Sequence, residues 1–150
     1  MKPTEIIIHC SATKEGVNYD LKDIDSWHRG RGFKKVGYHF VIRLDGTIET
    51  GRGENEVGAH CTGHNGRSIG ICYIGGLGED GKPKDTRTPE QLEALYLLIS
   101  KLVLKYDIKE EDIRVHNEFA NKACPCFSKA QFDLGFNEWL KEQIINTEEK

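Results

Sequence analysis

The sequence has no apolar run close to the ~20 residues that a membrane-spanning helix needs. Its first residues lack the apolar stretch and small-residue cleavage site of a secretory signal. It also lacks a basic excess, since 21 lysines and arginines face 24 aspartates and glutamates, for a formal net charge of -3. A nucleic-acid-binding protein normally carries a basic face, so that class is disfavoured. We expect a chain that is cytoplasmic as synthesised, enters no membrane, binds no nucleic acid and is a monomer.

Internal repeats, domain linkers and low-complexity segments are also absent from the 150 residues. A chain of this length fits one domain and can bury roughly two thirds of its unfolded surface, so it needs no disulfides to fold. The five cysteines are an odd number, and without an export signal they are expected to be thiols. We predict a single domain over residues 1–150, with a core from about 5 to 145 and a polar tail, 146–150, that frays.

What is present is an alternation of strand and helix patterns. Strands are predicted at residues 6–8, 38–44, 47–50, 68–74 and 113–115, with an Asp45-Gly46 hairpin turn between the second and third. Helices are predicted at about 21–30, capped by Asp20, at 89–106, capped by Thr88, and at about 134–145. Gly75 to Arg87 are predicted to form a flexible loop. This order predicts an α/β fold, a single domain with a central mixed β-sheet flanked by helices.

Two histidines follow predicted strands directly, which is where α/β proteins place their sites. His9 follows three isoleucines, and His116 follows the strand at 113–115. Cys124 lies eight residues beyond His116, within reach of a returning loop. Two imidazoles and one thiolate suit zinc, and three protein ligands leave a fourth position for water, as in catalytic sites. The spacing alone leaves a second interpretation open, in which the histidines are hydrogen-bonded strand ends and the cysteine is a buried thiol.

Several segments match one family in their order along the chain. They are IIHCSAT (7–13), WHRGRGF (27–33), VGYHFVI (36–42), DGT (45–47), VGAH (57–60), SIGI (68–71), TPEQ (88–91), VHNE (115–118) and KACP (122–125). On these segments, which run from residue 6 to about 139, the chain resembles the zinc-dependent N-acetylmuramoyl-L-alanine amidases. That family includes the amidase-type phage lysozymes and the peptidoglycan recognition proteins.

The resemblance implies a mixed sheet flanked by helices, with one Zn²⁺ per chain in a groove on one side. It implies that His9, His116 and Cys124 are the zinc ligands and that Tyr38 and Lys122 are catalytic. The implied reaction is hydrolysis of the amide between N-acetylmuramic acid and L-alanine in peptidoglycan, which releases stem peptides. His60 resembles a groove residue of the family that contacts substrate. His39 is a further candidate for a substrate contact, although it follows Tyr38 directly in a strand, where neighbouring side chains point to opposite faces.

Other functions stay open at this stage. A non-catalytic peptidoglycan-binding module is the main alternative, although the cysteine that such modules typically replace is present as Cys124. A regulatory role and a structural zinc site are less favoured. Cys126 departs from the family pattern and is a rival to Cys124 as ligand, whereas Cys10, Cys61 and Cys72 are expected to be buried thiols. The missing signal suits an endolysin that acts on the cell wall after release through a membrane lesion made by a partner.

Overall fold

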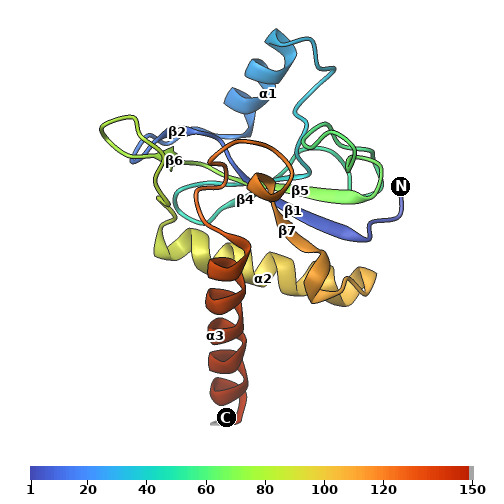
Figure 1. Cartoon of the computed structure of the whole chain (residues 1–150), viewed down its shortest axis with the longest axis vertical. Coiled ribbons are helices and arrows are strands. Elements are labelled where there is room, and N and C mark those ends of the chain that lie inside the picture. Colours follow the sequence, from blue (N-terminus) through green and yellow to red (C-terminus); the bar gives the residue numbers. More distant parts are fainter. Residues whose placement is uncertain (149–150) are drawn as a thin grey trace.

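The computed structural model describes residues 1–148, which form an α/β fold around a five-stranded mixed sheet (Figure 1). The strand order is β4–β3–β5–β1–β7. The strands are β1 (Glu5–Cys10), β3 (Phe40–Ile42), β4 (Ile48–Thr50), β5 (Ser68–Tyr73) and β7 (Ile113–Val115). All neighbouring pairs are parallel except the β3–β4 hairpin. The predicted fold class is therefore confirmed, and the predicted strands are all present with slightly different ends.

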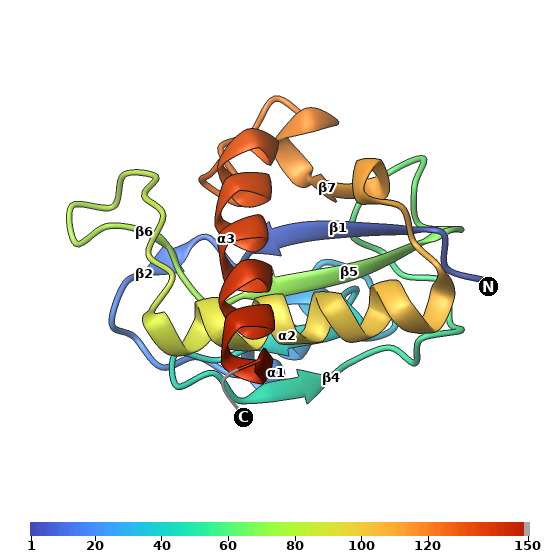
Figure 2. The ribbon, with the colours of Figure 1, turned by 90° about the horizontal axis from the view of Figure 1, so that it is seen from below.

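The three α-helices cover both faces of the sheet. Helix α1 (Leu21–Gly30) lies on one face, and α2 (Pro89–Tyr106) and α3 (Lys129–Glu148) lie on the other (Figures 1 and 2). Short 3-10 turns, η1 (Glu110–Asp112) and η2 (His116–Glu118), flank β7. None of the described helices is both long and apolar enough to cross a membrane.

The starts of α1 and α2 follow the predicted capping chemistry. The Asp20 carboxylate accepts the backbone N–H of Asp23, and Thr88 Oγ1 accepts that of Gln91, so each helix begins at a capping box. The spacing of Leu21, Ile24 and Trp27 predicts an apolar stripe on α1. The structure confirms Ile24 as buried, but the second buried residue of the helix is His28, and Trp27 is 41% exposed.

Helix α3 begins five residues earlier and ends three residues later than predicted. Ser128 Oγ accepts the N–H of Gln131 at 3.0 Å, and Gln131 Oε1 accepts the N–H of Ser128 at 2.7 Å. This reciprocal cap starts the helix at Lys129. Residues 146–148 are helical, residues 149 and 150 lie outside the described residues, and fraying of the 146–150 tail stays a prediction.

The loop predicted between residues 75 and 87 contains a strand. β6 (Gly76–Leu77) pairs in parallel with β2 (Thr13–Lys14) in a separate two-stranded sheet. Lys84 reinforces this contact, since its ammonium lies 2.9 Å from the Glu15 carboxylate. Two-residue strands are too short to leave a period-2 pattern, which explains why the sequence did not indicate them.

The two faces of the sheet are packed differently. On the α2 and α3 face, Ile6, Ile8 and Ile71 join an apolar core with residues such as Ile99 and Phe132. On the α1 face, a smaller apolar cluster is centred on Ile24, Val41, Cys72 and Ile74. The α1 face also carries the buried histidines described next.

Candidate metal centre

Two neighbouring parallel strands bring His9 and His116 together. β1 and β7 pair with Ile8 opposite Val115, so the next residues of both strands lie at the same edge of the sheet. Since Ile8 points into the α2 and α3 core, His9 points to the α1 face. The two imidazole centroids are 4.4 Å apart, and His9 is 1% exposed.

Cys124 reaches the same place from the loop that precedes α3. The backbone N–H of Cys10, at the end of β1, donates to Cys124 Sγ at 3.2 Å. The Tyr73 hydroxyl, at the end of β5, donates to the carbonyl of Pro125 at 2.7 Å and anchors the loop. One potential ligand atom each from His9, His116 and Cys124 lies within 4.8 Å of the others. The structure therefore brings together the three residues that the sequence singled out.

The electrostatics of the two histidines favour metal binding. Burial lowers the pKa of His9 well below its ordinary value, and the neighbouring His60 and His116 lower it further. Burial also lowers the pKa of His116, with the Lys122 cation adding to the effect. Both imidazoles are thus neutral at neutral pH, as metal ligands must be. His116 Nδ1 is buried without a hydrogen-bond partner among the described residues, which is the state of a nitrogen reserved for an ion.

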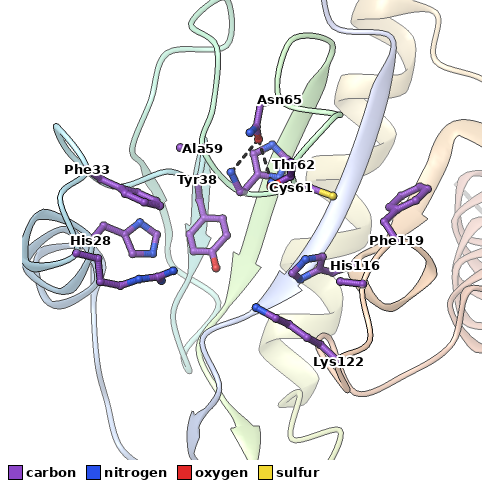
Figure 3. Close-up of a pocket in the computed structure, with 13 residues that line it drawn as sticks. His28, Phe33, Tyr38, Ala59, Cys61, Thr62, Asn65, His116, Phe119 and Lys122 are labelled. Atoms are coloured by element: carbon purple, nitrogen blue, oxygen red, sulfur yellow. Dashed lines mark hydrogen bonds between the residues drawn. The ribbon is translucent and has the colours of Figure 1, made fainter.

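Tyr38 and Lys122 flank this cluster in a pocket of about 420 Å³ (Figure 3). Their side chains point toward one another across the pocket, with the His116 ring beside them. The Tyr38 ring lies 5.1 Å from that of His9, between centroids. Burial raises the pKa of Tyr38 well above its ordinary value, so its hydroxyl stays protonated and can donate. The pocket thus places a neutral donor and a cation near three potential ligands.

The two other predicted histidines have different environments. His60 lines the pocket, and its Nδ1 lies 2.8 Å from His9 Nε2. His39 is fully buried and contacts the His60 ring edge to face, at 5.8 Å between centroids. Its Nδ1 accepts the N–H of Gly70 at 3.0 Å, and its Nε2 lies 2.7 Å from the carbonyl of Glu56. His39 is therefore outside the pocket lining, with both nitrogens engaged by backbone.

The remaining cysteines lie outside the cluster of potential ligands. Cys10, Cys61 and Cys72 are free and buried, as predicted. Cys126 Sγ lies 3.2 Å from the carbonyl of Gly76, on the side of the small β2–β6 sheet. The geometry thus groups Cys124, and not Cys126, with the two histidines.

Some pocket residues were missed by the sequence reasoning. His28, which is buried on the inner side of α1, lines the pocket, and its Nδ1 accepts the N–H of Gly37 at 2.8 Å. Arg31 and Phe33 line the same wall, with the guanidinium carbon 5.3 Å from the Phe33 ring centroid. All three lie in the WHRGRGF segment of the family resemblance, which was the available signal for them.

The site has two potential metal ligands at strand ends, a third in the loop before α3, and a tyrosine and a lysine beside them, which is the arrangement that the resemblance to the amidases implied. Comparison with known proteins makes the assignment specific. A model of the N-acetylmuramoyl-L-alanine amidase family matches residues 1–127. The chain belongs to this family and is an amidase of it.

Individual relatives agree with this assignment. The chain is 40% identical to the endolysin of Escherichia phage T7 over 143 residues, which cover 95% of this chain and 89% of the phage protein. Among solved structures, the N-acetylmuramoyl-L-alanine amidase LysC of Clostridium intestinale matches with a TM-score of 0.72 and 36% identity, over 83% of this chain and 76% of that one. A mutant of Drosophila PGRP-LB in complex with tracheal cytotoxin matches with a TM-score of 0.68 and 30% identity, over 83% and 76% of the two chains.

Proposed function

We propose that this amidase hydrolyses the amide between N-acetylmuramic acid and L-alanine in peptidoglycan, and that it depends on one Zn²⁺ per chain. The observation that carries the proposal is the convergence of His9, His116 and Cys124 within 4.8 Å beside a pocket that also contains Tyr38 and Lys122. We further propose that residues 1–150 act as one catalytic domain.

The three side chains fit zinc in their donor chemistry. Two neutral imidazoles and one thiolate are a common zinc-binding set, and three ligands leave one coordination position open. The Cys10 N–H that donates to Cys124 Sγ would stabilise a thiolate there. When bound, zinc acts as a Lewis acid that activates water and polarises the carbonyl of the scissile amide.

Tyr38 and Lys122 are the protein groups that we propose to act on the substrate directly. Hydrolysis of an amide develops negative charge on the carbonyl oxygen, and donors already aimed at that position lower the barrier. The Lys122 ammonium, which points into the pocket, can stabilise this charge (Figure 3). The Tyr38 hydroxyl is protonated and can donate a hydrogen bond or help to move a proton. Each such group is typically worth about 3 kcal/mol of barrier.

The pocket chemistry suits a substrate with negative charge, such as peptidoglycan stem peptides. Arg31 and Lys122 are among its lining residues, and no lining residue is acidic. The PGRP-LB neighbour was solved with tracheal cytotoxin bound, which supports a cell-wall fragment as ligand. His60 lines the pocket and is the proposed substrate contact, whereas the burial of His39 favours an indirect role.

The endolysin relative supports a place of action at the bacterial cell wall. We propose that the chain acts there as a monomer after release from the cytoplasm. A non-catalytic recognition module is the competing function, and a digestion experiment separates the two.

Purified peptidoglycan is incubated with the zinc-loaded protein, and the soluble products are analysed by mass spectrometry with and without a chelator. We expect stem peptides that begin at L-alanine, and we expect the chelator to abolish them. Cys124→Ser should release no peptides and hold no zinc, while the matched variant Cys126→Ser should resemble the wild type. Intact peptidoglycan together with tight stem-peptide binding would identify a recognition module, and zinc loss confined to Cys126→Ser would exchange the roles of the two cysteines.

A further inference from the structure

His60 contacts one of the three potential metal ligands but is not one of them. Its Nδ1 lies 2.8 Å from Nε2 of His9, and the two rings meet edge to face with centroids 4.9 Å apart. A hydrogen bond between two neutral imidazoles needs one protonated and one unprotonated nitrogen. The direction of this bond decides which nitrogen of His9 is left for an ion.

The surroundings of His60 set that direction. The Ser68 hydroxyl donates its single proton to the carbonyl of His64 at 2.7 Å. Toward His60 Nε2, which lies 3.2 Å away, the Ser68 oxygen can therefore only accept. The carbonyl of Ser68, 3.5 Å from the same nitrogen, is likewise only an acceptor. His60 thus carries its proton on Nε2, and its Nδ1 is an acceptor.

The hydrogen bond to His60 fixes the tautomer of His9, a proposed zinc ligand. Because His60 Nδ1 accepts, His9 Nε2 must donate, and the proton of a neutral His9 ring is on Nε2. The lone pair of His9 is then on Nδ1, the other ring nitrogen. His116 presents the same type of atom, since its Nδ1 is the buried nitrogen without a partner.

The backbone is shaped to hold the His60 ring in this position. A side chain on Gly70 would place its first carbon 2.6 Å from the His60 ring, and one on Gly58 would come within 2.7 Å. Both distances are below any ordinary contact, so the ring occupies space that only glycines leave open. The backbone N–H of His60 also donates to Asn65 Oδ1 at 2.8 Å.

We infer that His60 is a positioning residue for the metal site: it accepts the Nε2 proton of His9 and so fixes the His9 ring with Nδ1 turned to the ion. This inference rests on the proposed zinc dependence. Metal-bound histidines generally donate their second N–H to an acceptor, usually a carboxylate, a backbone carbonyl or water, and loss of that acceptor typically lowers metal affinity about 10- to 100-fold. At this site the acceptor is an imidazole nitrogen. The Ser68 hydroxyl extends the chain of hydrogen bonds by one member.

A matched pair of substitutions isolates the acceptor. In His60→Asn, the amide oxygen can occupy the place of Nδ1 and accept from His9. In His60→Leu, the leucine side chain has the same branched shape as asparagine but no hydrogen-bond acceptor. The two variants therefore leave similar space beside Gly58 and Gly70. His64→Leu is a control in the same loop, since the His64 side chain contacts Glu5 and Phe119 and not the metal cluster.

Zinc affinity is measured on the full chain by competition with a chromophoric chelator, and circular dichroism confirms folding. We expect His60→Leu to bind zinc about 10- to 100-fold more weakly than the wild type, and His60→Asn and His64→Leu to stay within about 3-fold of it. ¹⁵N NMR of zinc-loaded wild type should show His9 protonated at Nε2. Equal zinc affinity for the Asn and Leu variants, or a His9 proton on Nδ1, would overturn the inference. A wild type that binds no zinc would instead overturn the proposed function.

Discussion

The two faces of the central sheet are made by the same strands but differ in packing and in the residues that they carry. In β1, Ile6 and Ile8 point into an apolar core under α2 and α3, while His9, between Ile8 and Cys10, points to the α1 face. Both faces are buried, but the α2 and α3 face is packed by the larger apolar core, whereas the α1 face combines a smaller apolar cluster with hydrogen bonds among histidines and backbone. The difference suggests that stability resides mainly on the α2 and α3 face and chemistry on the α1 face.

The largest expected effect concerns the apolar face. Phe132 is fully buried and lies between Tyr96 and Phe136, with ring centroids 5.9 and 5.4 Å away. Phe132→Ala removes these contacts and leaves a cavity, so the free energy of unfolding should fall by about 3–5 kcal/mol. Urea denaturation measures the change, and zinc affinity is determined on the folded variant.

Leu134→Ala, on the same helix, is the matched control because Leu134 is 64% exposed. It should change the free energy of unfolding by less than about 0.5 kcal/mol. If Phe132→Ala weakens zinc binding in the folded protein, the two faces are coupled and the comparison fails.

The two faces also differed in how far the sequence predicted them. Buried strands and the capped helices followed from apolar runs and capping boxes, which are local signals. The α3 start was missed although its cap, Ser128 with Gln131, is just as local. Polar strand ends indicated His9 and His116, but the roles of Tyr38 and Lys122 came only from the family resemblance.

Contacts between distant segments on the α1 face had no local signal at all. His60 meets His9 across 51 residues of sequence, and the space for its ring depends on glycines at two further positions. Neither periodicity nor capping chemistry reports such contacts, because they arise only when β1, β5 and the loop before β5 are assembled. The buried position of His39 belongs to the same class, since its partners Gly70 and Glu56 lie on separate segments.

A smaller effect is expected from the catalytic groups of the α1 face. Tyr38→Phe and Lys122→Met should each lower turnover about 100-fold, which corresponds to about 3 kcal/mol, because each removes a donor to the developing charge. Zinc content and the free energy of unfolding should change little. Turnover is followed by release of stem peptides from purified peptidoglycan.

Tyr19→Phe and Lys34→Met make the same chemical changes outside the pocket lining. They should leave turnover within about 2-fold of the wild type, because neither side chain lines the pocket. A native rate in Tyr38→Phe or Lys122→Met would remove that residue from the proposed mechanism. Loss of zinc in either variant would make its role structural.

The smallest effect per site is a pH dependence of the free energy of unfolding, which should come from the buried histidines of the α1 face. Burial lowers the pKa of His39, and burial with the nearby His39 lowers that of His60 to about 3. In the unfolded chain both histidines take up protons as the pH falls through about 6.5. The unfolded state then binds more protons than the native state, so stability falls with falling pH, until the pH reaches the folded pKa. Each histidine contributes a slope of at most about 1.4 kcal/mol per pH unit, in the range between its unfolded and its folded pKa.

Urea unfolding of the zinc-free protein at pH 7.5, 6.5 and 5.5 measures this slope above the range where most carboxylates titrate. His39→Gln should be less stable at pH 7.5. Its free energy of unfolding should fall less steeply than that of the wild type below pH 6.5, by up to about 1.4 kcal/mol per pH unit. Phe132→Ala should lower the whole curve and keep the wild-type slope, because it alters the face that carries no titrating histidine. If His39→Gln keeps the wild-type slope, His39 takes up its proton in the folded protein, and the contrast between an apolar face and a face of neutral buried histidines would fail at that residue.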